Sequence, residues 1–189
     1  TRTARGIAMA MRNPFTLGPN AMTRRRPGRT SSTHWMAVTR EWVNRCGAFD
    51  TKCVRLEDCD WYERMIGSGA TARFEPSITS RYFPRDTYGE QFRIQVLNAW
   101  HRLRLFSRTG RGMRVRHLVP PLTFIMGSVL SATLFPWQYG VSAIVAAYAG
   151  LVMVSTAWVI APELSLLFHA STATIVAHAG HLTGMIAGT

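Results

Sequence analysis

The sequence predicts a mostly α-helical membrane protein, in which a small, basic, helical extramembrane region is followed by two to three transmembrane helices. The distribution of charge is the first observation behind this prediction. All 22 Lys and Arg residues lie at or before Arg116, and the only formally charged side chain after it is Glu163. A water-soluble segment with one charge in residues 117–189 would have almost no polar surface. We therefore expect this segment to lie in lipid.

The second observation is the length of the uncharged runs. Residues 118–136, 141–160 and 164–188 contain no Asp, Glu, Lys or Arg. At about 1.5 Å per residue in a helix, each run covers most of a hydrocarbon core about 30 Å thick. Trp137 and Tyr139 lie in the short break after the first run, and such aromatic side chains suit the head-group level. The runs predict a helical hairpin and a third, less apolar span.

Residues 1–32 are expected to form a basic, extended arm. Up to Arg40 the chain carries eight Arg residues, and its first carboxylate is Glu41. Segments that are rich in Arg and hydroxyl groups and lack acids are typical of organelle transit peptides. The arm therefore indicates a mitochondrial location. Arg24–Arg26 also fits a nucleic-acid-binding cluster, but the spans that follow favour a membrane protein without a nucleic-acid partner.

Residues 33–116 are expected to form a basic helical region outside the membrane. Thr33 can cap a helix that ends near Cys46, and Asp50 or Thr51 can cap a second helix that ends near Ile66. The second helix carries the acidic residues Glu57, Asp58, Asp60 and Glu63. We expect these acids to pair with neighbouring arginines. The odd number of cysteines, Cys46, Cys53 and Cys59, predicts reduced thiols and no metal site.

A third helix is predicted over 86–106, with Phe92, Val96, Trp100 and Leu103 on one stripe. An apolar stripe among arginines suits a membrane interface, and packing on a partner subunit is the alternative. Each basic residue near an anionic leaflet gains about 1 kcal/mol. The arginines expected at the lipid interface are Arg93, Arg102, Arg104, Arg108, Arg111, Arg114 and Arg116. No cofactor is expected, but an anionic lipid such as cardiolipin fits these arginines. Their position before the first span places the basic region on the matrix side.

Small residues recur at helical spacing in two of the spans. Gly180, Gly184 and Gly188 are four residues apart, as are Ala146 and Gly150. Small side chains let helix backbones approach closely in lipid. These residues therefore predict helix packing against other membrane subunits.

Residues 140–188 resemble the rhomboid intramembrane serine proteases. Gly-Val-Ser-Ala at 140–143, with Gly150 following, is similar to the family's nucleophile helix, and residues 177–188 are similar to its last core helix. The resemblance implies Ser142 as nucleophile and His181 as general base. Alanine follows Ser142 where the family has glycine, and only 39 residues separate Ser142 from His181. These departures favour an inactive relative.

A membrane histidine in a basic protein with three spans also resembles the anchor subunits of succinate dehydrogenase. That resemblance implies a haem or quinone site, with His178 or His181 as a ligand. The two histidines are neighbours on one helix face, so they cannot both be axial ligands of one haem.

The prediction that best accounts for these features is a non-catalytic accessory subunit of a mitochondrial inner-membrane energy-transducing complex, either of the respiratory chain or of ATP synthase. It would pass the membrane several times and act in assembly or packing. The alternatives are the rhomboid-like protease, or its inactive relative, and the haem- or quinone-associated anchor.

Overall fold

The computed structural model describes residues 1–17, 26–30, 36–79, 81–134 and 137–188. The chain is mostly helical, which confirms this part of the predicted fold class. Its elements, in chain order, are α1 (Arg2–Arg12), α2 (Pro14–Leu17), β1 (Gly28–Arg29), α3 (Arg40–Cys46), α4 (Glu57–Gly67), β2 (Arg73–Phe74), α5 (Tyr88–Thr109), α6 (Val115–Leu134), α7 (Trp137–Ile160), the 3-10 helix η1 (Ala161–Leu166) and α8 (Leu167–Ala187).

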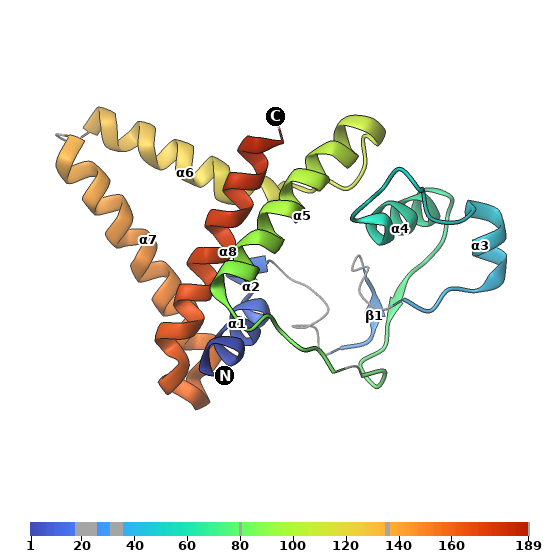
Figure 1. The fold of residues 1–189 in the computed structure, drawn as a ribbon, viewed down its shortest axis with the longest axis horizontal. Coiled ribbons are helices and arrows are strands. Elements are labelled where there is room, and N and C mark those ends of the chain that lie inside the picture. Colours follow the sequence, from blue (N-terminus) through green and yellow to red (C-terminus); the bar gives the residue numbers. More distant parts are fainter. Residues whose placement is uncertain (18–25, 31–35, 80, 135–136, 189) are drawn as a thin grey trace.

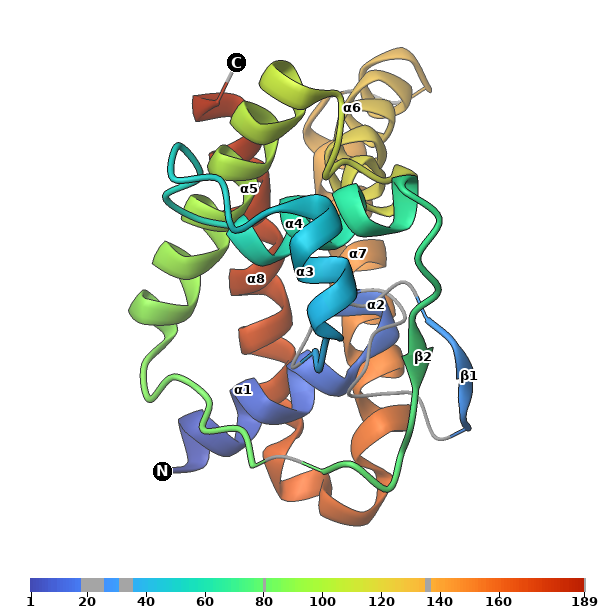
Figure 2. The same ribbon diagram turned by 90° about the vertical axis from the view of Figure 1, so that its right-hand side faces the viewer.

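Helix α8 is the central helix of the chain. It packs along α5 on one side and contacts α1 and α7 on others (Figures 1 and 2). The residues that it buries are mostly small: Ala170, Ser171, Ala173, Thr174, Ala177, Gly180 and Gly184. Because small side chains keep the helix narrow, three other helices can approach its axis closely.

The contact between α5 and α8 depends on the glycines of α8. A Cβ atom at Gly180 would lie 2.9 Å from Cβ of Gln95, and one at Gly184 would lie 2.8 Å from Cβ of Ala99. Gly188 likewise faces Leu103. These pairs share one offset of 85 positions in the sequence, so the two helices run parallel and in register.

We predicted that these glycines pack against another membrane subunit, whereas in this structure they pack against α5 of the same chain. Helix α5 of the same chain fills the groove along Gly180 and Gly184, and no other subunit is needed there. Part of the apolar stripe of the 86–106 helix, which we expected to face a membrane surface, packs on α8 instead. Residues of its apolar stripe, Val96 and Leu103, face the glycines of α8. Glycine spacing predicts a groove but not what fills it.

The start of the chain differs from the predicted extended arm. Residues 2–12 form α1, which the Thr1 hydroxyl caps by accepting a hydrogen bond from the amide of Ala4 at 3.1 Å. Ile7 is 0% exposed and packs with Ala10 against Ala173 of α8. The arginines of this stretch are exposed. Arginines on one face and apolar residues on the other form an amphipathic helix, and α8 covers its apolar face.

The only acid of the carboxyl-terminal part is also bound by α1. Glu163, in η1, forms an ion pair with Arg5. Gly6 on the same helix leaves room for α8, since a Cβ atom there would lie 2.7 Å from the carbonyl carbon of His169. The first helix is thus an integral part of the helical body.

Helices α6 and α7 form an arm that diverges from the body at its far end (Figure 1). Val152, Thr156 and Ile160 of α7 are buried at four-residue spacing, where α7 contacts α8 and α1. Among the described residues, one helical stretch, Ser142–Ile160, is long and apolar enough to cross a membrane. The structure thus supports a membrane-spanning helix by length and composition, at a coarser level than the two to three predicted spans.

The basic region holds α3, α4 and a short ribbon (Figure 2). Strands β1 and β2 pair antiparallel, with Gly28 opposite Phe74 and Arg29 opposite Arg73. Both helices begin later than predicted, α3 at Arg40 and α4 at Glu57. The proposed cap Thr33 lies outside the described residues.

Replacing Gly184 with Ala tests the α5–α8 contact. On an unhindered helix surface, Gly→Ala raises stability by up to about 1 kcal/mol. At Gly184 the new methyl group would overlap Ala99 and the carbonyl of Val96. We expect this overpacking to lower the free energy of unfolding by about 2 kcal/mol, measured by thermal unfolding of the detergent-solubilised protein. Gly150→Ala is the matched control, because nothing lies within 4 Å of a Cβ atom there. An equal change in the free energy of unfolding for Gly184→Ala and Gly150→Ala would contradict the close packing of α5 on α8.

Candidate functional site

The arginines expected at the lipid interface lie partly in ion pairs with acidic residues. Arg108 pairs with Asp50 at 2.8 Å, and Arg114 lies 3.7 Å from Glu63. Arg111 lies 3.5 Å from Asp60. The predicted pairing of acids with arginines is confirmed for Asp60 and Glu63.

The remaining arginines of that set have varied surroundings. Arg93 is exposed. The Arg104 guanidinium lies 4.0 Å from the centre of the Trp100 ring, and Arg102 donates to the carbonyl of Gly112 at 2.6 Å. The side chain of Arg116 lies outside the described part. Arg102 and Arg104 are thus engaged within the chain, and Arg93 is exposed.

Asp60 is the buried centre of the charged network. Its side chain is 2% exposed and accepts a hydrogen bond from Nε of Arg64 at 2.9 Å. Arg64 also donates to the carbonyl oxygens of Cys46 and Ala48. One carboxylate and one guanidinium therefore hold the end of α3 against α4. Since a buried charge without a partner is costly, this pair is expected to keep the two helices together.

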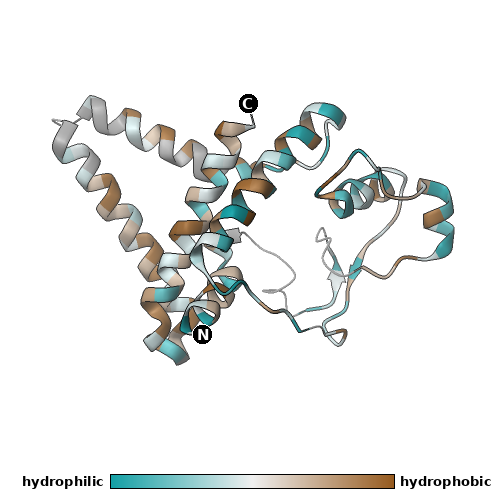
Figure 3. Ribbon diagram, in the orientation of Figure 1, coloured by the Kyte–Doolittle hydropathy of each residue, from teal (hydrophilic) through white to brown (hydrophobic). Residues whose placement is uncertain are grey.

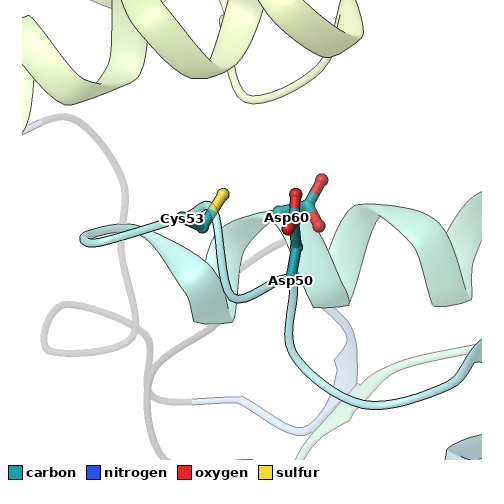
Figure 4. Close-up of side chains that lie close together, drawn as sticks. All are labelled: Asp50, Cys53 and Asp60. Carbon is teal, nitrogen blue, oxygen red and sulfur yellow. The ribbon is translucent and has the colours of Figure 1, made fainter.

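Asp50, Cys53 and Asp60 bring three potential metal ligands within 4.8 Å of one another (Figure 4). Arginine side chains form hydrogen bonds or ion pairs with all three of these residues. Nη2 of Arg108 lies 2.8 Å from Asp50 and donates to Sγ of Cys53 at 2.9 Å, while Arg64 and Arg111 bind Asp60. The guanidinium groups supply the positive charge that a metal ion would bring. The arrangement favours a structural network over a metal centre.

Both ring nitrogens of His178 are bound by groups of the chain. Nδ1 lies 2.8 Å from the hydroxyl of Tyr148, and Nε2 lies 3.1 Å from the carbonyl oxygen of Phe15. A haem iron would need one of these nitrogens. His178 therefore acts as a bridge between α7, α8 and the α2 segment in this structure.

Ser142 and His181 lie on different helices, α7 and α8. Ser142 is exposed near the start of α7. Nε2 of His181 lies 2.8 Å from the carbonyl oxygen of His117, at the start of α6. A general base must lie within hydrogen-bond reach of its nucleophile, and the bonded nitrogen of His181 faces a different group.

The amino-terminal segment contributes to a buried polar cluster that its sequence does not predict. Asn13 donates to the Ser155 hydroxyl at 3.2 Å and accepts from the amide of Phe15 at 2.9 Å. The hydroxyls of Thr16 and Thr174 are 2.9 Å apart. Asn13 before Pro14 is a signal for a helix end, but no local signal reveals partners more than 140 residues away. The cluster joins the start of the chain to α7 and α8.

The described polar groups are thus engaged mainly with one another, in patterns that hold helices together. Comparison with known protein families, curated proteins and solved structures finds no match to this chain. What distinguishes the molecule is the contrast between charged and apolar parts. In Figure 3 hydrophobic residues recur along α7, whereas hydrophilic ones gather on α3 and α4.

Asp60→Asn tests the charged network. The substitution removes the negative charge that Arg64 and Arg111 face and should destabilise the packing of α4 by on the order of 2 kcal/mol. Hydrogen exchange of the α4 amides in the detergent-solubilised protein measures this loss. Asp86→Asn, at an exposed position before α5, makes the same change of charge outside the network and should leave α4 protected. Unchanged exchange of α4 in the Asp60 variant would refute the role of the pair.

Proposed function

We propose that this chain is a non-catalytic accessory subunit of a mitochondrial inner-membrane energy-transducing complex, of the respiratory chain or of ATP synthase. In this proposal the α6–α7 arm anchors the subunit in the bilayer, and the basic region lies on the matrix side. Its role is assembly and structural packing.

The exposed face of α7 is the observation that carries the proposal. Val145, Val154 and Trp158 are 60%, 69% and 79% exposed, and only 17% of the apolar stretch Ser142–Ile160 is buried. Each Å² of apolar surface left in water costs about 25 cal/mol. A core helix of a soluble protein would be largely covered by its own chain. Lipid or apolar partner helices would remove this surface from water.

The engagement of the polar groups supports a structural role. His178 is bonded through both ring nitrogens, and the bonded nitrogen of His181 faces His117. Asp50 and Asp60 are bonded by arginines. The contacts of His178 and His181 are of the kind that joins helices, which supports a structural role for these two residues.

The mitochondrial location in this proposal rests on the Arg-rich, acid-free composition of residues 1–40, although α1 within that stretch belongs to the folded body. The basic residues that immediately precede α6, among them Arg111 and Arg114, support the matrix-side orientation. Since α5 fills the glycine groove of α8, the surface proposed for other membrane subunits is the small-residue face of α7 at Ala146 and Gly150. Both are exposed, and small residues permit close helix contacts in lipid.

Val154→Lys tests the anchoring. A Lys near the centre of a spanning helix costs about 2.5–3.5 kcal/mol for insertion, so the fraction that resists alkaline carbonate extraction should fall. Val54→Lys is the control, because Val54 is also exposed but lies in the basic region before α4. The unsubstituted protein and the Val54 variant should both stay with the membrane. Release of the unsubstituted protein by carbonate would refute the anchor.

Gly150→Leu tests the proposed contact with other subunits. The larger side chain should block close approach of a partner helix while leaving insertion intact, because Leu favours lipid. Native electrophoresis of membranes should show loss of co-migration with the larger complex. Val154→Leu changes an apolar residue of the same helix and should co-migrate normally. Full co-migration of the Gly150 variant would exclude this face as the interface.

A further inference from the structure

A pocket of about 500 Å³ lies where the ribbon, α4 and the segment between α5 and α6 meet. Arg29 of β1 and Arg111 and Arg114 of the connecting segment line it. Of the described residues that line it, Glu63 is the only acid. Three guanidinium groups against one carboxylate leave a local charge of about +2, which favours an anionic ligand.

We propose that this pocket binds the phosphate of an anionic lipid head group. The inference rests on the proposed membrane location and adds a specific ligand class to it. Arginine forms two parallel hydrogen bonds to a phosphate through its planar fork. Arginines that come from two separate segments can hold one phosphate from two directions.

The connecting segment is held in place by its own hydrogen bonds. The amide of Gly112 donates to Glu63 at 2.7 Å, and its carbonyl accepts from Arg102 at 2.6 Å. Gly112 has a φ of +88°, and a Cβ atom there would lie 2.8 Å from Cδ2 of Leu105. The tight turn therefore requires glycine. The hydrogen bonds of Gly112 fix this turn, and Arg111 and Arg114 flank it in the sequence.

The ribbon side of the pocket is fixed by Tyr62. This buried side chain donates a hydrogen bond to the carbonyl oxygen of Thr30 at 2.8 Å, next to Arg29. Burial raises the pKa of the Tyr62 phenol, so the group keeps its proton at neutral pH. The same pocket is lined by Ile66 and Ala72. Apolar walls beside a cationic group suit an amphiphilic anion better than a fully hydrated one.

The position of the pocket in the chain argues for a lipid as the source of the phosphate. Arg114 directly precedes Val115, the first residue of α6. If α6 and α7 enter the bilayer, the pocket lies next to the head groups of the leaflet that the arm enters. Free phosphate has the same fork chemistry but lacks the glycerol and acyl parts that would contact apolar walls.

Arg29→Gln and Arg73→Gln form a matched pair for the test. Both arginines are exposed and lie opposite each other in the ribbon, but only Arg29 lines the pocket. Binding of cardiolipin to the full-length protein in detergent is titrated by native mass spectrometry, with phosphatidylcholine as the zwitterionic control. We expect Arg29→Gln to weaken cardiolipin binding about tenfold, as loss of one charged hydrogen bond predicts, and Arg73→Gln to change it less than about twofold. Arg29→Lys should restore part of the affinity.

Three results would overturn the proposal. Equal losses for Arg29→Gln and Arg73→Gln would mean general attraction by a basic surface. Binding of phosphatidylcholine as tight as that of cardiolipin would remove the role of the anion. Inorganic phosphate that competes at the same concentration as cardiolipin would assign the pocket to a soluble anion. Carbonate resistance of the same variants reports on the membrane anchor separately, so failure of the pocket and failure of the anchor are distinguishable.

Discussion

The close contact between α5 and α8 is the constraint on which the arrangement of the other elements depends. Because Gly180 and Gly184 bring the two backbones together over several turns, α5 and α8 must occupy the same depth relative to any membrane. Arg93, Arg104 and Arg108 on α5 are exposed, and each would cost about 2.5–3.5 kcal/mol at the centre of a bilayer. An apolar α8 is thereby tied to a charged helix. Among the described residues, this leaves α7, with its apolar stretch Ser142–Ile160, as the helix that is long and apolar enough to cross a membrane.

Ion pairs hold together the elements of the basic region. Asp60 and Glu63 of α4 draw together Arg64, Arg111 and Arg114, so α4 is fixed to α3 and to the turn before α6. Buried ion pairs contribute less to stability than their geometry suggests, because both partners lose hydration. Their value here is in orientation, since they determine which way the turn at Gly112 faces. Arg111 and Arg114 of this segment then line one pocket together with Arg29.

Much of the helical content could be predicted from local signals, whereas the partners could not. Apolar spacing correctly indicates α5, with an end three residues later than predicted. The glycines of α8 indicate close packing, but a groove has the same sequence pattern whichever helix fills it. Residues 2–12 were misread because arginines without acids are shared by transit peptides and by amphipathic helices of a folded body. Bonds such as that between His178 and Phe15 join residues 163 positions apart, and nothing in their local sequence encodes such a pairing.

The union of the first helix with the last has a consequence for how the chain matures. The Thr16 hydroxyl lies beside that of Thr174, 158 positions away, and Ile7 packs in one cluster with Ala173 of α8. During synthesis, α1 and α5 must therefore wait for α8 with their apolar faces uncovered. Contacts between distant parts of a chain form slowly, because loop closure precedes any gain from packing. The nascent protein consequently passes through a long-lived intermediate with exposed apolar surface. Chaperones that bind such surface would determine what fraction of the chains folds and what fraction aggregates.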